Sequence, residues 1–204
     1  MMTDQSKQNH KEKMQALQAE QKKKAAEAVD PGRGLVLVHT GNGKGKSSSA
    51  FGVIARALGW GNKVGVVQFI KGKWITGERK FFEKFPDDIV WHTMGDGFTW
   101  NTQDLEKDKI AAEAAFSQGL EMMVSGSFDL VVMDEINIAL RYDYLNVNDV
   151  IDGLKKRSDK TSVILTGRDA KPELMEYADL VSEMLEIKHP FKNAGIKAQR
   201  GIDF

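Results

Sequence analysis

The sequence predicts an α/β fold in which a mostly parallel sheet carries helices on both faces. Short apolar runs, such as 35–38 and 128–134, alternate with longer segments whose apolar residues recur every three or four positions. Apolar runs of this length are typical of strands buried on both faces of a parallel sheet. A glycine-rich stretch joins the first run to the first helical segment. Strands that alternate with helices build such a sheet through right-handed crossovers.

The elements follow one another in a regular order. Apolar runs predict six strands, at 35–38, 63–69, 89–93, 128–134, 161–166 and 180–188. Helical spacing predicts helices at 46–58, 104–125, 147–157 and 171–178. Asn146 is the expected cap of the third helix, and Pro172 suits the first turn of the fourth. Residues 189–204 have no clear period and could wrap the sheet edge or the site.

Residues 1–30 form an arm that differs in composition from the domain expected over 31–204. The arm is rich in Lys, Gln, Ala and Glu, so its helix propensity is high. Its apolar face is too narrow to anchor a helix alone. Two interpretations stay open: a solvated, partly disordered extension, or an arm that becomes helical on a ligand or a second subunit.

Composition excludes several classes of function. Lys+Arg and Asp+Glu number 29 each, so net charge gives no reason to expect nucleic acid or a membrane as the main partner. The absence of cysteine removes disulfides, thiolate zinc sites and cysteine nucleophiles. No apolar run approaches the roughly 20 residues that span a bilayer, and the four histidines form no metal-binding spacing. We therefore expect a soluble, cytoplasmic protein without a histidine metal site.

The glycine-rich stretch has the residues of a phosphate-binding P-loop. It reads Gly41, Asn42, Gly43, Lys44, Gly45, Lys46 and Ser47, followed by Ser48. Glycines let backbone N–H groups approach phosphate oxygens, and the following helix points its positive end at them. Lys46 adds a charge and the Ser47 hydroxyl could ligate Mg²⁺. The fold is therefore expected to be P-loop NTPase-like (RecA-like). Thr40 stands where a glycine is usual, and a glycine-rich turn without a ligand is the alternative.

A second element supports a nucleotide site. The strand at 128–134 ends in Asp134 and is followed by Glu135. In ATPases the first such acid holds the Mg²⁺ shell and the second can orient or activate a nucleophile. Arg168 follows the next strand and could reach a phosphate. The loops at 41–47, 71–78, 95–101, 134–137 and 167–169 should converge at the carboxyl edge of the sheet. Solvated acids and a surface arginine are the alternatives.

Two further loops carry candidate residues. Lys71, Trp74 and Glu78 follow the second strand, where ligand contacts gather, although a loop with a packed tryptophan is an equal alternative. Phe98 and Trp100 lie among glycines and polar residues after the third strand. Loops normally run over the surface, so this pair is either tucked into the core or forms an apolar wedge for a large flat ligand.

Six segments together resemble the P-loop type of ATP:cob(I)alamin (corrinoid) adenosyltransferase. They are GNGKGKS at 41–47, FIKGKWITGE at 69–78, GDGFTW at 95–100, VVMDE at 131–135, LTGRDA at 165–170 and KHPFKNAGIKAQRGIDF at 188–204. The resemblance covers 34–204. One departure is Ser47-Ser48, where a pair of threonines is often seen, and serine keeps the hydroxyl ligand.

The resemblance implies transfer of the 5′-deoxyadenosyl group of ATP to cobalt(I) of a corrinoid, with release of triphosphate, in adenosylcobalamin biosynthesis or salvage. It implies that 41–48 and Arg168 bind ATP, and that Lys44, Lys46, Asp134 and Glu135 serve catalysis. Mg²⁺ or Mn²⁺ would be held by Ser47 and the two acids. Phe98 and Trp100 would pack against the corrinoid.

The same resemblance implies a homodimer in which the arm folds over the corrinoid site, and an electron donor such as a reduced flavoprotein. The main rival is a RecA-like ATPase or nucleotide-dependent switch, in which Glu135 would activate water. Neutral net charge and the GDGFTW segment argue against it. A small-molecule kinase would lead us to expect an arginine-rich lid, and 136–170 contains no such cluster.

Overall fold

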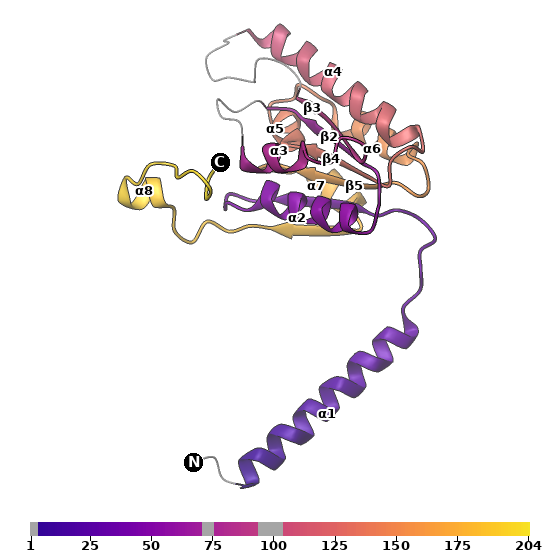
Figure 1. Ribbon diagram of the computed structural model, residues 1–204, viewed down its shortest axis with the longest axis vertical. Coiled ribbons are helices and arrows are strands. Elements are labelled where there is room, and N and C mark those ends of the chain that lie inside the picture. The colour runs from indigo at the N-terminus through magenta and orange to yellow at the C-terminus, as the bar shows by residue number, and fades with distance from the viewer. Residues whose placement is uncertain (1–3, 71–75, 94–103) are drawn as a thin grey trace. The chain divides into compact units, whose positions relative to one another are not determined.

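The computed structural model describes residues 4–70, 76–93 and 104–204 (Figure 1). The chain divides into two compact units, 1–32 and 33–204. The first contains one helix, α1, over Asp4–Glu27. Ion pairs one helical turn apart, Lys24 with Glu20 and Lys23 with Glu27, support it.

The second unit is built on one six-stranded sheet whose order is β3-β2-β4-β5-β1-β6. Every neighbouring pair of strands is parallel. The strands are β1 (Val36–Thr40), β2 (Val64–Gln68), β3 (Ile89–Thr93), β4 (Leu130–Asp134), β5 (Ser162–Thr166) and β6 (Leu180–Glu183). The predicted α/β fold, built on a parallel sheet, is confirmed.

Helices cover both faces of this sheet (Figure 1). One face carries α2 (Lys46–Gly59) and α3 (Gly77–Phe82). These two helices are in contact through Phe51 and Phe82, whose rings meet edge to face with centroids 6.3 Å apart. The other face carries α4 (Leu105–Val124), α5 (Ile136–Arg141), α6 (Val147–Lys155) and α7 (Pro172–Tyr177). A last short helix, α8 (Pro190–Ala194), lies in the C-terminal segment.

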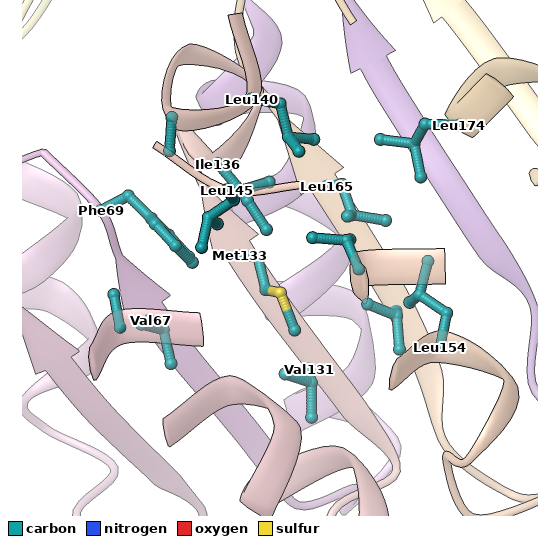
Figure 2. Close-up of a cluster of buried hydrophobic side chains, with 14 of the residues drawn as sticks. Val67, Phe69, Val131, Met133, Ile136, Leu140, Leu145, Leu154, Leu165 and Leu174 are labelled. Atoms are coloured by element: carbon teal, nitrogen blue, oxygen red, sulfur yellow. The ribbon is translucent and has the colours of Figure 1, made fainter. Parts of the chain in front are cut away.

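Two hydrophobic clusters, one on each face, hold the helices to the strands. In β4 the alternate residues Val131 and Met133 join the cluster under α4 to α7, which Figure 2 shows with Phe69 and Leu165 around Met133. Their neighbours Leu130 and Val132 join the cluster under α2 and α3. Because both faces are covered, the strand is apolar at every position instead of at alternate ones.

The prediction of a final strand over 180–188 is wrong beyond Glu183. There the Met184 N–H still donates to Thr40 O (2.9 Å), but Met184 O then accepts from the Gly43 N–H (2.7 Å). Gly43 belongs to the loop after β1, so the chain continues beside a loop instead of a strand. Three short helices, α3, α5 and α8, were not predicted. Each spans only five or six residues, which leaves little period to recognise; α7 is as short, but the sequence marked its start with Pro172.

Across the described ranges, no helix combines the length and the apolar character that crossing a membrane requires.

Candidate functional site

Three of the predicted loops come together at the carboxyl edge of the sheet. Strands β4, β5 and β1 are consecutive neighbours, so the loops that follow them lie side by side. The loop after β1 is the glycine-rich stretch, the loop after β5 carries Arg168, and β4 ends in Asp134 with Glu135 behind it. The parallel sheet therefore brings together a cationic loop and two acids that are far apart in sequence.

The glycine-rich loop ends where α2 begins, at Lys46. Gly45 caps the helix in the left-handed conformation (φ 113°), and no side chain caps its first N–H groups. Uncapped N–H groups at a helix start form a site for an anion. Lys46 is buried, and its Nζ donates to Gly43 O at 2.6 Å. Ser47 is half-buried at this helix start, and Ser48 is exposed.

The electrostatics of Lys46 show that positive charge is concentrated here. Burial lowers the pKa of Lys46, Glu135 and Asp134 oppose that shift, and the positive charges of Arg168 and Lys44 add to it. Lys44 and Arg168 therefore both lie within electrostatic reach of Lys46. A bound polyanion would relieve their repulsion.

Asp134 is held at both carboxylate oxygens. The Thr166 hydroxyl donates to Oδ1 (2.8 Å) and the Gln68 amide donates to Oδ2 (3.1 Å). The Trp91 indole N–H in turn donates to the Gln68 amide oxygen (3.0 Å). These side chains come from β5, β2 and β3, so a hydrogen-bonded network crosses the sheet and fixes the Asp134 carboxylate in place.

Glu135, unlike Asp134, has a carboxylate oxygen without a hydrogen-bond partner. Its backbone is left-handed (φ 65°), a conformation that is rare outside glycine and tends to mark functional sites. Its Oε2 atom is buried and has no hydrogen-bond partner. Burial raises the pKa of Glu135 to about 7, with a further contribution from the negative charge of Asp134, while Lys46 and Arg168 oppose the shift. An unpaired buried carboxyl of this kind is a functional-site candidate.

Gly167 makes room for this arrangement. Its φ of 129° suits only glycine, and a Cβ there would lie 2.9 Å from the Asn137 Cβ and 3.2 Å from Glu135 Oε2. The Asn137 amide donates to Gly167 O at 3.2 Å. His39 lies buried on β1, and burial lowers its pKa, which keeps the imidazole neutral at pH 7.

The other predicted residues are placed differently. Glu78 lies in the first turn of α3, whereas Lys71, Trp74, Phe98 and Trp100 lie outside the described residues. A cavity of about 840 Å³ between α4, α6 and the start of α7 has none of the glycine-rich loop in its lining, so we do not place the site there.

Five residues at or around the acids and the loop were not singled out from the sequence, although Asn137 and Gly167 lie in loops that were expected here: Gln68, Asn137, Thr166, Gly167 and Asp203. Gln68 and Thr166 each follow a run of apolar residues at the end of a strand, and that polar ending was a signal that could have identified them. Asp203, which pairs with Lys44, has no local signal because its partner is distant in sequence.

Comparison with known proteins identifies the kind of enzyme. A family model described as ATP:corrinoid adenosyltransferase BtuR/CobO/CobP matches residues 32–204. A corrinoid adenosyltransferase of Pseudomonas aeruginosa is 51% identical over 97% of this chain and 96% of its own length. One from Escherichia coli is 42% identical over 98% of this chain and 100% of its own length. Among solved structures, the flagellar accessory protein FlaH from Methanocaldococcus jannaschii covers 74% of this chain and 70% of its own at 12% identity, with a TM-score of 0.48, a likeness too low to argue from.

The match includes the glycine-rich loop, both acids and Arg168 in one family segment. It therefore favours adenosyl transfer over the RecA-like ATPase or switch alternative. The chain belongs to the ATP:corrinoid adenosyltransferase family and is an enzyme of that activity.

Proposed function

We propose that the carboxyl edge of the sheet transfers the 5′-deoxyadenosyl group of ATP to the cobalt(I) of a corrinoid substrate and releases inorganic triphosphate. The observation that carries this proposal is the buried Lys46 at the start of α2, within electrostatic reach of Lys44, Arg168 and two acids. Such a group suits a ligand with several negative charges. Family membership supplies the corrinoid as the acceptor.

The reaction needs no side-chain nucleophile. Cobalt(I) supplies both electrons of the new Co–C5′ bond, and the electrons of the C5′–O5′ bond leave with the triphosphate. No proton is transferred in this step, so no general base is required. The protein then contributes position and charge, while the corrinoid carries the difficult chemistry. The absence of cysteine from the chain fits this division.

Stabilisation of the leaving group is the task of the glycine-rich loop. Negative charge builds up on the triphosphate oxygens as the C–O bond breaks, and fixed donors and cations aimed at that charge lower the barrier. We assign this task to Lys44, Lys46, the backbone N–H groups of 41–48 and, from the neighbouring strand, Arg168.

The residues fit a magnesium ion, or manganese in its place. Mg²⁺ is usually held by one or two carboxylates, with substrate phosphates and water completing its shell. Glu135 presents a buried, unpartnered oxygen, Asp134 is fixed by its hydrogen bonds, and Ser47 adds a hydroxyl at the helix start. The described residues contain no group of three or more His, Asp or Glu side chains that could by itself hold a metal ion, and Mg²⁺ does not need one when phosphates and water complete its shell. The ion would neutralise charge on the triphosphate.

Phe98 and Trp100 are proposed to pack against the corrinoid and displace its lower axial ligand. A cobalt(II) centre without axial donors is easier to reduce, because filled donor orbitals no longer raise its acceptor level. Trp100→Ala should therefore impair adenosylation that starts from cobalt(II) more than it weakens ATP binding. Trp60→Ala is the matched control, since Trp60 is 83% exposed at the end of α2. Equal loss of both activities in Trp100→Ala would count against the assignment.

We further propose a homodimer in which α1 of one subunit orders over the corrinoid site of the other. Support comes from the exposed apolar residues of α1, Met14 and Leu17, because a helix with so narrow an apolar face needs an external partner. Deletion of residues 1–30 should raise the KM for the corrinoid without changing the Kd for ATP.

A reduced flavoprotein is the proposed electron donor.

The test is anaerobic. The protein is mixed with Mg-ATP and chemically reduced cob(I)alamin, the absorbance is followed, and the released phosphate species are separated. Light-sensitive alkylcobalamin with stoichiometric triphosphate is the expected result. ADP and monophosphate without alkylation would contradict the proposal and restore the hydrolytic alternative.

A further inference from the structure

The C-terminal segment, 184–204, packs directly against the glycine-rich loop. The Gly43 N–H donates to Met184 O (2.7 Å), and a Cβ on Gly43 would come within 2.7 Å of Leu185 O. A Cβ on Gly41 would collide with Met184 O. These two glycines are therefore required by the approach of the C-terminal backbone, in addition to any requirement set by phosphate.

The end of this segment is a closed turn that fixes one carboxylate. The Asp203 N–H donates to Gln199 O (2.8 Å), and the Gln199 N–H donates back to Asp203 Oδ2 (2.8 Å). The Asp203 side chain is only 11% exposed. Its second oxygen, Oδ1, is left to bind outside the turn. The turn thus holds a carboxylate in one orientation.

That second oxygen contacts a cation of the loop. Asp203 Oδ1 lies 2.6 Å from Lys44 Nζ, and the Lys44 side chain is 55% exposed. Hydrogen bonds from Lys44 and from the Gln199 N–H lower the pKa of Asp203, so this carboxyl group is ionised at neutral pH. A loop cation assigned to triphosphate is therefore occupied by a carboxylate of the same chain.

An ion pair with one half-exposed partner is easily exchanged. When the two separate, water solvates the half-exposed Lys44 ammonium and the Asp203 carboxylate keeps its hydrogen bond from the Gln199 N–H, so the pair contributes little net stability. Lys46 differs, since it is buried and donates to a backbone carbonyl of its own loop. Of these two lysines, Lys44 is the one that can change partner at low cost. Triphosphate, with several charges, is a stronger partner for an ammonium than one carboxylate.

We propose that Asp203 is the counter-ion that Lys44 exchanges for a phosphate oxygen, so that the C-terminal turn competes with triphosphate for the loop. This deepens the proposed function and rests on its assignment of triphosphate to the loop. The competition weakens the hold on triphosphate, which is the product that must leave after each transfer. Asp203 is thereby a residue that controls product release without touching the reacting atoms.

The test measures binding of inorganic triphosphate with Mg²⁺, in the absence of corrinoid, by isothermal titration calorimetry. Asp203→Asn keeps an oxygen that can accept from the Gln199 N–H but removes the charge. It should bind triphosphate about twofold to fivefold more tightly, the size expected for an ion pair of this exposure. Lys44→Ala should bind it more weakly. In the Lys44→Ala background, Asp203→Asn should have little further effect.

Asp152→Asn is the matched control, because Asp152 forms an ordinary exposed ion pair with Lys155 at 2.9 Å on α6. It should leave triphosphate affinity unchanged. Unchanged or weaker binding in Asp203→Asn overturns the exchange, as does an equal gain in the Lys44→Ala background. A variant that merely damaged the fold could not bind more tightly. Because no adenosyl transfer is measured, the result is independent of whether the C5′ chemistry itself is upheld.

Discussion

The amino and carboxyl edges of one sheet differ in whether their charged side chains have partners. At the amino edge, Arg33 donates two hydrogen bonds to Asp179 (2.6 and 2.8 Å), and the Val36 N–H donates a third (2.8 Å). These contacts lower the pKa of Asp179 to about 2. At the carboxyl edge, Glu135 has a buried oxygen without a partner and a pKa of about 7.

This difference suggests different roles for the two edges: the amino edge stabilises the fold, and the carboxyl edge is the candidate site. The amino-edge contacts anchor the start of the domain, and the Arg157 guanidinium adds a hydrogen bond to Gly34 O (3.0 Å) there. The carboxyl edge keeps an unpaired acid, a strained backbone and neighbouring cations that would each be more stable with a ligand bound. Unfavourable features of this kind persist where binding or catalysis uses them. We therefore expect substitutions at the two edges to change different quantities.

The largest expected effect is on catalysis, at the carboxyl edge. Lys46→Met removes the buried charge at the start of α2 and should lower kcat/KM for adenosyl transfer by about 100-fold or more, the size found when one donor to developing charge is lost. Its stability should not fall, because a buried ammonium is costly to hold. Steady-state kinetics and urea unfolding of the same variant measure both. A loss of activity with a parallel loss of stability would make Lys46 a structural residue.

The next largest effect is expected for Glu135→Gln, which should increase the free energy of unfolding by an amount that depends on pH. The folded pKa of Glu135 is about 7 against an ordinary 4.5, so the folded state retains a proton that the unfolded state has lost. Stability should therefore fall as pH rises from about 4.5 to about 7. Glu135→Gln removes this penalty, worth about 3 kcal/mol at pH 8, and gains little at pH 4.

Urea unfolding across this pH range checks the prediction, with Glu121→Gln on the exposed side of α4 as the control. Parallel pH profiles for the wild type and Glu135→Gln would refute it. Activity of Glu135→Gln should fall at every pH if the carboxylate serves Mg²⁺.

A third prediction concerns backbone strain at the same edge. Gly167→Ala places a Cβ at a φ of 129° and against the Asn137 Cβ, and should cost about 2 kcal/mol of unfolding free energy. Gly52→Ala is the matched control, because a Cβ there meets nothing within 4 Å in the middle of α2. It should be neutral or stabilising. Equal costs at the two positions would argue against strain at Gly167.

The smallest effect is expected at the amino edge. Asp179→Asn should cost under about 1 kcal/mol at pH 7, because the side chains of Arg33 and Asp179 are 43% and 25% exposed and solvent screens the pair. The depressed pKa makes this contribution complete above about 3.8, and it is lost as pH falls through about 2. Thermal unfolding between pH 2 and 7 measures it, and adenosyl transfer should be unchanged. A loss of activity would contradict the separation of the two edges.

The long periodic elements could be predicted from the sequence, and so could the site residues that belong to local motifs. Leu130 to Asp134 is recognisable because both faces are buried, and Lys46 because glycines and a serine flank it. The left-handed backbone of Glu135 and the network from Thr166 through Asp134 to Gln68 depend on strand order. The pairing of Asp203 with Lys44 depends on where the chain goes after β6. A single sequence shows only local periodicity. These features could not be predicted from it because they arise when the tertiary structure brings distant residues together.

In the proposed reaction, the bond from C5′ to its oxygen breaks while the glycine-rich loop holds the triphosphate. ATP labelled with ¹⁸O at the 5′ bridging position, mixed with cob(I)alamin and the protein, tests it by mass spectrometry of the products. All of the label should leave in triphosphate, and none should stay on the adenosyl group. Label retained in a nucleotide, with unlabelled phosphate released, would show that a phosphorus–oxygen bond breaks and would contradict the claim.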